Sequence, residues 1–221
     1  MTFPQLALFD LDGTLLDSAP DMLATVDAMR ARRGMAGMAF EALRPQVSRG
    51  ARAMIGAAFP EWGLAACEAA VPEFLDDYRR VLGRHGGPFE GVEAMLAELE
   101  AAGTRWGIVT NKPESLARAL VPMLGWQDRC AVLLGGDTLP VRKPDPAPLL
   151  HAADALGIAP SACVYVGDDE RDIAAARAAG MPSVVALWGY RPLDCDPAAW
   201  GGDVAVDAAS ALCDPSAWPP A

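Results

Sequence analysis

FDLDGT, residues Phe9–Thr14, is the most informative stretch of the chain. It follows the apolar run Gln5–Phe9, which has the composition of a strand buried on both faces. Asp10 ends this strand and Asp12 lies two residues further on, so both carboxylates reach the crevice where open α/β sheets bind ligands. Gly13 permits a sharp turn there. Two carboxylates this close repel each other unless a cation or a shared proton relieves them, which favours a reactive site over a loop with helix-capping aspartates.

Three further polar segments also follow predicted strands. Thr110 and Asn111 follow one strand and offer a hydroxyl and N–H groups to an anion. Lys143 lies in the run KPDP, where prolines restrict its neighbours and favour the start of a helix. Asp168 leaves another strand at a position suited to a hard cation, and Asp172 lies one helical turn beyond it. The sequence therefore predicts that four strand ends contribute to one site.

Apolar runs of strand length alternate with helical patterns from about residue 88 onward. The runs lack polar alternation, as is typical of parallel strands that are covered on both faces. The helical patterns repeat apolar residues at i, i+3, i+4 and i+7 and end at a glycine. This alternation predicts an α/β fold, a doubly wound, Rossmann-like parallel sheet with right-handed crossovers. Besides the first run, the predicted strands are Arg105–Val109, Cys130–Leu134, Ala162–Val166 and Ser183–Leu187.

Residues 18–83 break this alternation and contain no convincing strand. Their apolar residues recur at helical spacing in three stripes, so we expect a small all-helical domain at 18–83, inserted after the first strand. A flexible, glycine-rich stretch, Gly83–Pro88, closes the insertion, and residues 1–17 with 84–221 form the core domain. The three stripes are Met22, Val26 and Met29; Ala51, Met54, Ile55 and Ala58; and Phe74, Leu75, Tyr78 and Leu82.

The composition excludes several classes of protein. With 221 residues and 52% hydrophobic side chains the chain can bury a core, and a net charge of −11 argues against nucleic-acid or anionic-membrane partners. Five cysteines without a CxxC pair, no secretory signal pattern and no apolar run of about 20 residues predict a cytoplasmic protein. We expect a monomer or homodimer that binds a small molecule, with a frayed tail at DPSAWPPA, residues Asp214–Ala221.

The four segments, taken in order, resemble the signature motifs of the haloacid dehalogenase-like superfamily. They are FDLDGT, the strand-end Thr110, Lys143 of KPDP, and GDDERD at Gly167–Asp172. The resemblance covers essentially the whole chain, including a helical cap inserted after the first motif. True dehalogenases lack an acid at the position of Asp12, whereas phosphatases and phosphomutases carry one. The resemblance therefore implies a hydrolase that acts on a phosphate monoester.

The resemblance also implies roles for the carboxylates. Asp10 attacks phosphorus in line and forms an aspartyl phosphate, which water then hydrolyses. Asp12 protonates the leaving alkoxide and later deprotonates that water. Mg²⁺ is the implied cofactor, held by carboxylate oxygens of Asp10 and Asp168, by the backbone carbonyl of Asp12 and by water.

The remaining motif residues are implied to bind the phosphoryl group. Thr110, the Asn111 amide and Lys143 stabilise charge on the phosphoryl oxygens. Asp172 is expected to act indirectly, by orienting Lys143 or a water bound to the cation. For the neighbouring Asp169 we expect only the start of a helix, where an acidic side chain satisfies the helix dipole.

Longer stretches narrow the resemblance to a branch near phosphoglycolate phosphatase. Within this branch the chain looks most similar to N-acetylmuramic acid 6-phosphate phosphatases, so this cell-wall sugar ester is the expected substrate. The alternatives are 2-phosphoglycolate and a sugar phosphomutase of the β-phosphoglucomutase type; a non-catalytic binding protein would have little need for both motif aspartates. The stretches are VSRGARAM (Val47–Met54), WGIVTNKP (Trp106–Pro113), VGDDERDI (Val166–Ile173) and WGYRPLDCDPAAWGGDVAVD (Trp188–Asp207).

Ser48, Arg49 and Arg52 form a candidate specificity loop in the cap. A guanidinium there can bind a substrate carboxylate with two hydrogen bonds. Muramic acid and glycolate both carry a carboxylate, so the loop does not choose between them. We expect Arg52 to bind the substrate carboxylate. For Arg49, a position on a solvated helix face is an equal alternative.

Overall fold

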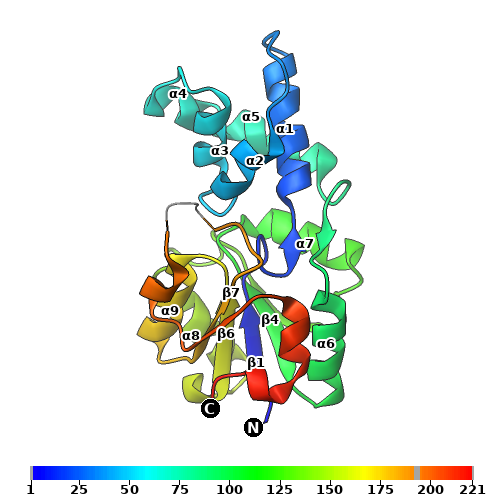
Figure 1. The fold of residues 1–221 in the computed structure, drawn as a ribbon, viewed down its shortest axis with the longest axis vertical. Helices are drawn as coiled ribbons and strands as arrows, with labels where there is room; N and C mark the ends of the chain where they lie inside the picture. Colours follow the sequence, from blue (N-terminus) through cyan, green and yellow to red (C-terminus); the bar gives the residue numbers. More distant parts are fainter. Residues whose placement is uncertain (1, 192–194, 221) are drawn as a thin grey trace.

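The computed structural model describes residues 2–191 and 195–220. Within these residues, six parallel strands form one sheet in the order β5-β4-β1-β6-β7-β8. The two central strands are β1 and β6, which Figure 1 labels together with β4 and β7. The chain leaves β1, builds β4 and β5 on one side, and then crosses to β6, β7 and β8 on the other. The predicted doubly wound α/β fold is confirmed. The strands are β1 (Leu6–Phe9), β4 (Arg105–Val109), β5 (Cys130–Leu134), β6 (Cys163–Gly167), β7 (Ser183–Ala186) and β8 (Val204–Val206).

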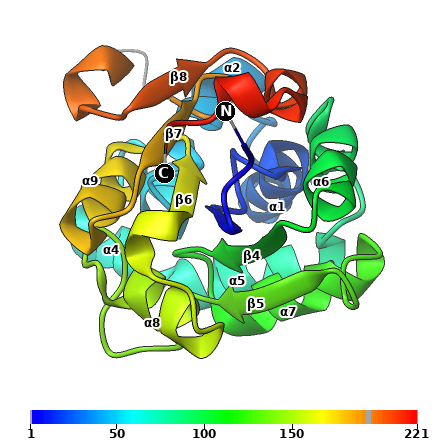
Figure 2. The ribbon, with the colours of Figure 1, turned by 90° about the horizontal axis from the view of Figure 1, so that it is seen from below.

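Strands β1, β6 and β7 are buried on both faces, which explains the absence of polar alternation in them. Leu6 and Leu8 point into a hydrophobic cluster with α8 and α9, whereas Ala7 and Phe9 join a second cluster with α6 and α7. Figure 2 shows α8 and α9 on one side of the sheet and α6 with the C-terminal turns on the other. The core helices are α6 (Val92–Ala101), α7 (Glu114–Met123), α8 (Ala147–Ala155) and α9 (Glu170–Ala179), and the short 3₁₀ turns are η2 (Pro160–Ala162), η3 (Pro197–Trp200), η4 (Ala209–Cys213) and η5 (Pro215–Ala217).

The strand-free insertion forms a group of helices that lies beyond the carboxyl ends of the strands (Figure 1). Apolar stripes hold it together, since Met22, Val26 and Met29 of α1 and Phe74 and Tyr78 of α5 are all buried. Its division from the core as a separate folding domain stays a prediction. No helix in the described part of the chain is long and apolar enough to span a membrane. The elements are α1 (Ala19–Ala31), α2 (Phe40–Leu43), η1 (Arg44–Gln46), α3 (Ala51–Ala58), α4 (Leu64–Ala69) and α5 (Val71–Val81).

Two connections between the cap helices and the core are fastened to each other. Strand β2 (Leu16–Asp17) pairs antiparallel with β3 (Gly87–Pro88). The buried Asp21 carboxylate accepts the backbone N–H groups of residues 83, 84 and 85 at 2.7, 3.2 and 2.7 Å. At Gly86 an added Cβ would lie 2.2 Å from the Asp17 carbonyl oxygen, so only glycine fits there. The stretch expected to be flexible is therefore tied to the first turn of α1.

The expectation of a frayed C-terminal tail is wrong for residues 214–220, and Ala221 lies outside the described residues. Trp218 is 2% exposed, and its Nε1 donates a hydrogen bond of 2.9 Å to the Leu212 carbonyl. Its ring meets Phe3 and Phe9 edge-on, with centroids 6.3 and 6.5 Å away. The sheet face that carries Phe9 needs an apolar cover, and the tail supplies part of it. A tail rich in proline and alanine does not reveal this use, because the contact partners lie at the other end of the chain.

We expect Trp218→Ala to lower the free energy of unfolding by about 3–5 kcal/mol, the usual cost of removing a buried tryptophan. Urea unfolding followed by circular dichroism measures the change. Leu64→Ala is the matched control, since Leu64 is 82% exposed and its truncation should change stability by no more than about 0.5 kcal/mol. Equal stabilities of the two variants would show that the tail does not contribute to the core.

Candidate active site

The carboxyl ends of the central strands bring the predicted motif residues together. Asp10 directly follows β1, Thr110 follows β4 and Asp168 follows β6, and these three strands are neighbours in the sheet. Lys143 comes from the loop after β5 and reaches inward, with its Nζ 3.1 Å from Asp10 Oδ1. All four residues are buried or nearly so. The parallel topology therefore places segments more than 150 residues apart at one point.

Lys143 is held in a closed network. Its Nζ contacts Asp10 and lies 2.7 Å from Asp172 Oδ1, and it donates a 2.7 Å hydrogen bond to the Tyr165 hydroxyl. The Tyr165 hydroxyl in turn donates to the Val109 carbonyl at 2.7 Å. Burial lowers the pKa of Lys143, but Asp10 and Asp172 outweigh it and the net pKa is raised, so the ammonium stays charged. The contact with Asp172 fits the expectation that this carboxylate orients Lys143.

Three buried carboxylates converge where a cation would relieve their repulsion. Asp10, Asp168 and Asp172 each offer an oxygen within 4.8 Å of the others. Burial, followed by the charges of Asp10 and Asp172, raises the pKa of Asp168 well above its usual range. Burial also raises the pKa of Asp172, although Lys143 opposes it. Carboxylate oxygens are the donors that Mg²⁺ prefers, so this cluster fits a divalent cation.

The Asp168 side chain is positioned by several contacts. Thr14 Oγ1 donates to its Oδ1 at 3.1 Å, and the backbone N–H of Tyr190 donates to its Oδ2 at 2.8 Å. Ser48 of the cap donates to the same Oδ2 at 3.0 Å. Gly13 has φ of +88°, and a Cβ there would lie 2.2 Å from Asp168 Oδ2. The turn in FDLDGT therefore needs glycine both for its backbone and for the approach of Asp168.

Asp169 begins α9, as expected from the sequence. Its carboxylate accepts the N–H of Arg171, and Asp172 completes a reciprocal capping box with the Asp169 N–H. Arg171, which the sequence analysis did not single out, pairs with Asp169 at 2.7 Å and donates to the backbone carbonyl of Ser48. The GDDERD segment thus also ties the core to the cap loop.

Thr110 and Asn111 lie beside the acidic cluster. Thr110 is buried, and its Oγ1 accepts the backbone N–H of Lys112 at 3.3 Å. Asn111 Nδ2 donates to the Lys143 carbonyl at 3.0 Å, so this side chain positions the loop that carries the lysine. Its Oδ1 is buried and has no hydrogen-bond partner in the described part of the chain. The role of Thr110 and Asn111 toward a phosphoryl group stays a prediction.

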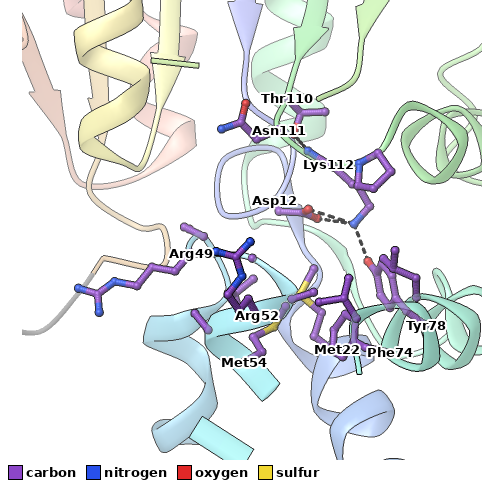
Figure 3. Close-up of a pocket in the computed structure, with 18 of the residues that line it drawn as sticks. Asp12, Met22, Arg49, Arg52, Met54, Phe74, Tyr78, Thr110, Asn111 and Lys112 are labelled. Atoms are coloured by element: carbon purple, nitrogen blue, oxygen red, sulfur yellow. Dashed lines mark hydrogen bonds and ion pairs between the residues drawn. The ribbon is translucent and has the colours of Figure 1, made fainter. Parts of the chain in front are cut away.

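The structure adds Lys112 and Tyr78, which sequence reasoning did not assign to the site. Lys112 Nζ lies 3.0 Å from both carboxylate oxygens of Asp12 and 2.6 Å from the hydroxyl of Tyr78 (Figure 3). Two signals for Lys112 were available: it follows Thr110-Asn111 directly, and it is one of only two lysines in the chain, the other being Lys143. Tyr78 gave no such signal, because its spacing on α5 is that of a core residue.

A cavity of about 730 Å³ lies between the cap and these residues. Asp12, Thr110 and Lys112 approach it from the core, and Arg49, Arg52 and Met54 from the cap (Figure 3). All three predicted specificity residues, Ser48, Arg49 and Arg52, line it. Arg52 forms an ion pair with Glu68, and both side chains are more than half exposed. Glu68 contacts Nε of Arg52, and the binding of a substrate carboxylate by this guanidinium stays a prediction.

The family model for haloacid dehalogenase-like hydrolases matches residues 4–180, and the chain belongs to this family. A phosphoglycolate phosphatase of Xanthomonas campestris pv. campestris (strain 8004) is 62% identical over 219 residues, which cover 99% of each chain. An N-acetylmuramic acid 6-phosphate phosphatase of Pseudomonas aeruginosa is 44% identical over 211 residues, which cover 94% of this chain and 92% of the relative. A crystal structure of a predicted phosphoglycolate phosphatase from Haemophilus somnus superposes with a TM-score of 0.84 at 26% identity, covering 96% and 97% of the two chains.

The comparisons confirm the predicted family and enzyme class. The protein is a hydrolase of the phosphatase type. The expected substrate is less well supported, because the relative with 62% identity is named a phosphoglycolate phosphatase and the muramic acid enzyme is 44% identical. The relatives therefore favour the alternative, 2-phosphoglycolate. The core motifs do not separate the two branches, since both need the same phosphoryl chemistry.

We expect Asp168→Asn to lower the affinity for Mg²⁺ by more than about tenfold, or ~1.4 kcal/mol of binding free energy, because it removes a charged oxygen donor from the cluster. Asp169→Asn should leave Mg²⁺ affinity unchanged, since asparagine also caps a helix and Asp169 lies outside the cluster. Isothermal titration of Mg²⁺ and the half-saturating Mg²⁺ concentration in turnover both measure this. Comparable losses in the two variants would contradict the assignment.

Proposed function

We propose that this protein is a Mg²⁺-dependent phosphatase that hydrolyses a small carboxylated phosphate ester, with 2-phosphoglycolate as the substrate. One observation carries the proposal: a carboxylate at the end of the central strand, Asp10, lies 3.1 Å from a buried lysine and within 4.8 Å of the Asp168 and Asp172 carboxylates. Such a site can place a nucleophile, a cation and a positive charge around one phosphoryl group. The name of the Xanthomonas relative supports the choice of ester.

In the proposed reaction an Asp10 oxygen attacks phosphorus, and the bond from phosphorus to the ester oxygen breaks. Asp12 gives its proton to the departing oxygen, which leaves as the alcohol. A water molecule then attacks the aspartyl phosphate while Asp12 takes a proton from it, which releases phosphate and restores Asp10. Lys143 and Thr110 hold the phosphoryl oxygens throughout.

The chain offers a set of oxygen donors for the cation. Carboxylates of Asp10 and Asp168, together with the Asp12 backbone carbonyl, would hold Mg²⁺, while Lys143 engages Asp172. When bound, Mg²⁺ supplies positive charge that offsets the repulsion between the nucleophile and the phosphoryl group. Burial is the first cause of the raised pKa of Asp168, because it disfavours the charged carboxylate. A bound cation would stabilise that charged form.

N-acetylmuramic acid 6-phosphate is the second candidate, and the size of the cavity favours it. About 730 Å³ is within the range of sites that enclose a drug-sized ligand and is more than a two-carbon acid fills. The cap side contributes apolar side chains, among them Met22, Met54 and Phe74, which can pack against the acetyl and lactyl methyl groups of this ester. The Pseudomonas relative carries this activity in its name.

We expect Asp10→Asn to abolish phosphate release while the fold persists, because an amide cannot attack phosphorus and is a poor ligand for Mg²⁺. Phosphate release from several esters measures the loss, and urea unfolding of the same preparation controls for stability. Near-normal turnover of several esters by this variant would rule out a covalent mechanism through Asp10.

A hydrolysis panel tests the substrate. We expect kcat/KM for 2-phosphoglycolate to exceed that for N-acetylmuramic acid 6-phosphate by about tenfold or more, which is ~1.4 kcal/mol of transition-state binding. Sugar phosphates and β-glucose 1-phosphate, the latter with and without glucose 1,6-bisphosphate, complete the panel and detect mutase activity. A preference for the muramic acid ester would show that the cavity, and not the name of the more similar relative, predicts the substrate.

A further inference from the structure

Lys112 is buried at the boundary between core and cap, and each of its three N–H donors has an acceptor. Its side chain is 2% exposed, and Nζ lies 3.0 Å from each Asp12 oxygen and 2.6 Å from the Tyr78 hydroxyl. The oxygens within hydrogen-bond distance of Nζ are therefore those of Asp12 and Tyr78, and these contacts orient the ammonium toward Asp12.

The contact with Asp12 restricts the carboxylate in a way that a single hydrogen bond does not. Both oxygens of Asp12 are equidistant from Nζ, so rotation of the carboxylate breaks at least one contact. The Asp12 side chain is 14% exposed and lines the cavity, so it remains accessible from the substrate side. Lys112 thus holds Asp12 at the wall of the cavity, where Asp12 stays accessible to a substrate.

Tyr78 makes the arrangement depend on the cap. It lies on α5, whereas Lys112 and Asp12 belong to the core, and the lysine Nζ is 4.4 Å from the centre of the Tyr78 ring. Burial raises the pKa of Tyr78 to about 12, so its hydroxyl is neutral and can accept from the ammonium. Movement of α5 away from the core would remove one acceptor and the aromatic face from Lys112 together.

We propose that Lys112 is a positioning residue for Asp12 and that Tyr78 links this position to closure of the cap. The proposal rests on the proposed function, in which Asp12 donates a proton to the leaving group. In the closed arrangement Asp12 is aligned while the cap covers the cavity. In an open arrangement Lys112 has lost Tyr78, and Asp12 is held less firmly. The alignment of Asp12 is thereby coupled to the state in which the substrate is enclosed.

The chain's use of lysine supports this role. Of its 18 basic residues besides histidine, only Lys112 and Lys143 are lysine, and both are buried against motif aspartates. Arginine is planar and wide, whereas an ammonium is a compact charge with three donors, which suits a narrow buried position. A buried ion pair contributes little net stability on average, so its presence at Asp12 calls for a role other than holding the fold.

The test compares two esters that differ in their need for a proton. Cleavage of 2-phosphoglycolate expels the alkoxide of glycolate, which needs protonation, whereas cleavage of p-nitrophenyl phosphate expels a stable phenolate, which does not. The ratio of kcat/KM for 2-phosphoglycolate to kcat/KM for p-nitrophenyl phosphate is measured on one preparation. Any loss of folded or active enzyme lowers both values equally and leaves this ratio unchanged. Asp12→Asn serves as the reference for a defect in proton transfer, and Mg²⁺ half-saturation is recorded for every variant.

We expect Lys112→Met to lower the ratio by about 10- to 100-fold, in the same direction as Asp12→Asn. Tyr78→Phe should lower it by about three- to tenfold, the effect of one hydrogen bond. Because Tyr78 acts through Lys112, the double variant should lose no more than Lys112→Met alone. Mg²⁺ half-saturation should stay the same in the Lys112 and Tyr78 variants.

Other outcomes would overturn the inference. If both esters slow equally in Lys112→Met and in Tyr78→Phe, the two residues serve only the fold. Tyr78→Phe removes a single hydroxyl and keeps the test decisive if Lys112→Met does not fold. If Asp12→Asn changes the ratio while these variants do not, the inference fails and the proposed role of Asp12 survives. If Asp12→Asn leaves the ratio unchanged, the inference and that role fail together.

Discussion

The structure depends on one electrostatic constraint, the burial of several carboxylates at the carboxyl edge of a parallel sheet. Asp10, Asp168 and Asp172 lie within 4.8 Å of one another, and such a cluster is unfavourable unless positive charge compensates it. The chain provides Lys143 inside the cluster and Lys112 beside it, against Asp12. A divalent cation would complete the balance. Because β1 lies between β4 and β6, Thr110 and Asp168 end at the same edge of the sheet as Asp10.

The cap supplies parts that the core lacks. Ser48 reaches Asp168, Arg171 of the core holds the Ser48 carbonyl, and Tyr78 reaches Lys112. Cap residues that line the cavity therefore also contact residues beside the motif aspartates. The β2–β3 pair, together with the backbone contacts of Asp21, fixes the two chain connections around which the cap helices attach.

The expectations that failed share a physical cause. The Asp214–Ala221 segment has the composition of a frayed end, but Trp218 covers the sheet face that carries Phe9. Strand β8 was missed because it has three residues and only Val206 is buried, which leaves no pattern to detect. In each case the deciding partner is distant in sequence or too small to leave a periodic signal.

The sequence alone determined the fold class, the strands β4 and β5 to the residue, and the motif side chains that meet at the sheet edge. It could do so because strand burial leaves continuous apolar runs, and because the ends of parallel strands necessarily meet at one edge. Only the tertiary structure showed that the Lys112 ammonium contacts both carboxylate oxygens of Asp12 and the hydroxyl of Tyr78. Lys112 and Asp12 are 100 residues apart, and the contact of Lys112 with Tyr78 depends on the placement of α5 over the core. No local sequence pattern encodes that placement, because it arises from the packing of the cap helices. The apolar stripes of these helices specify which side chains are buried, but not which polar group each side chain contacts.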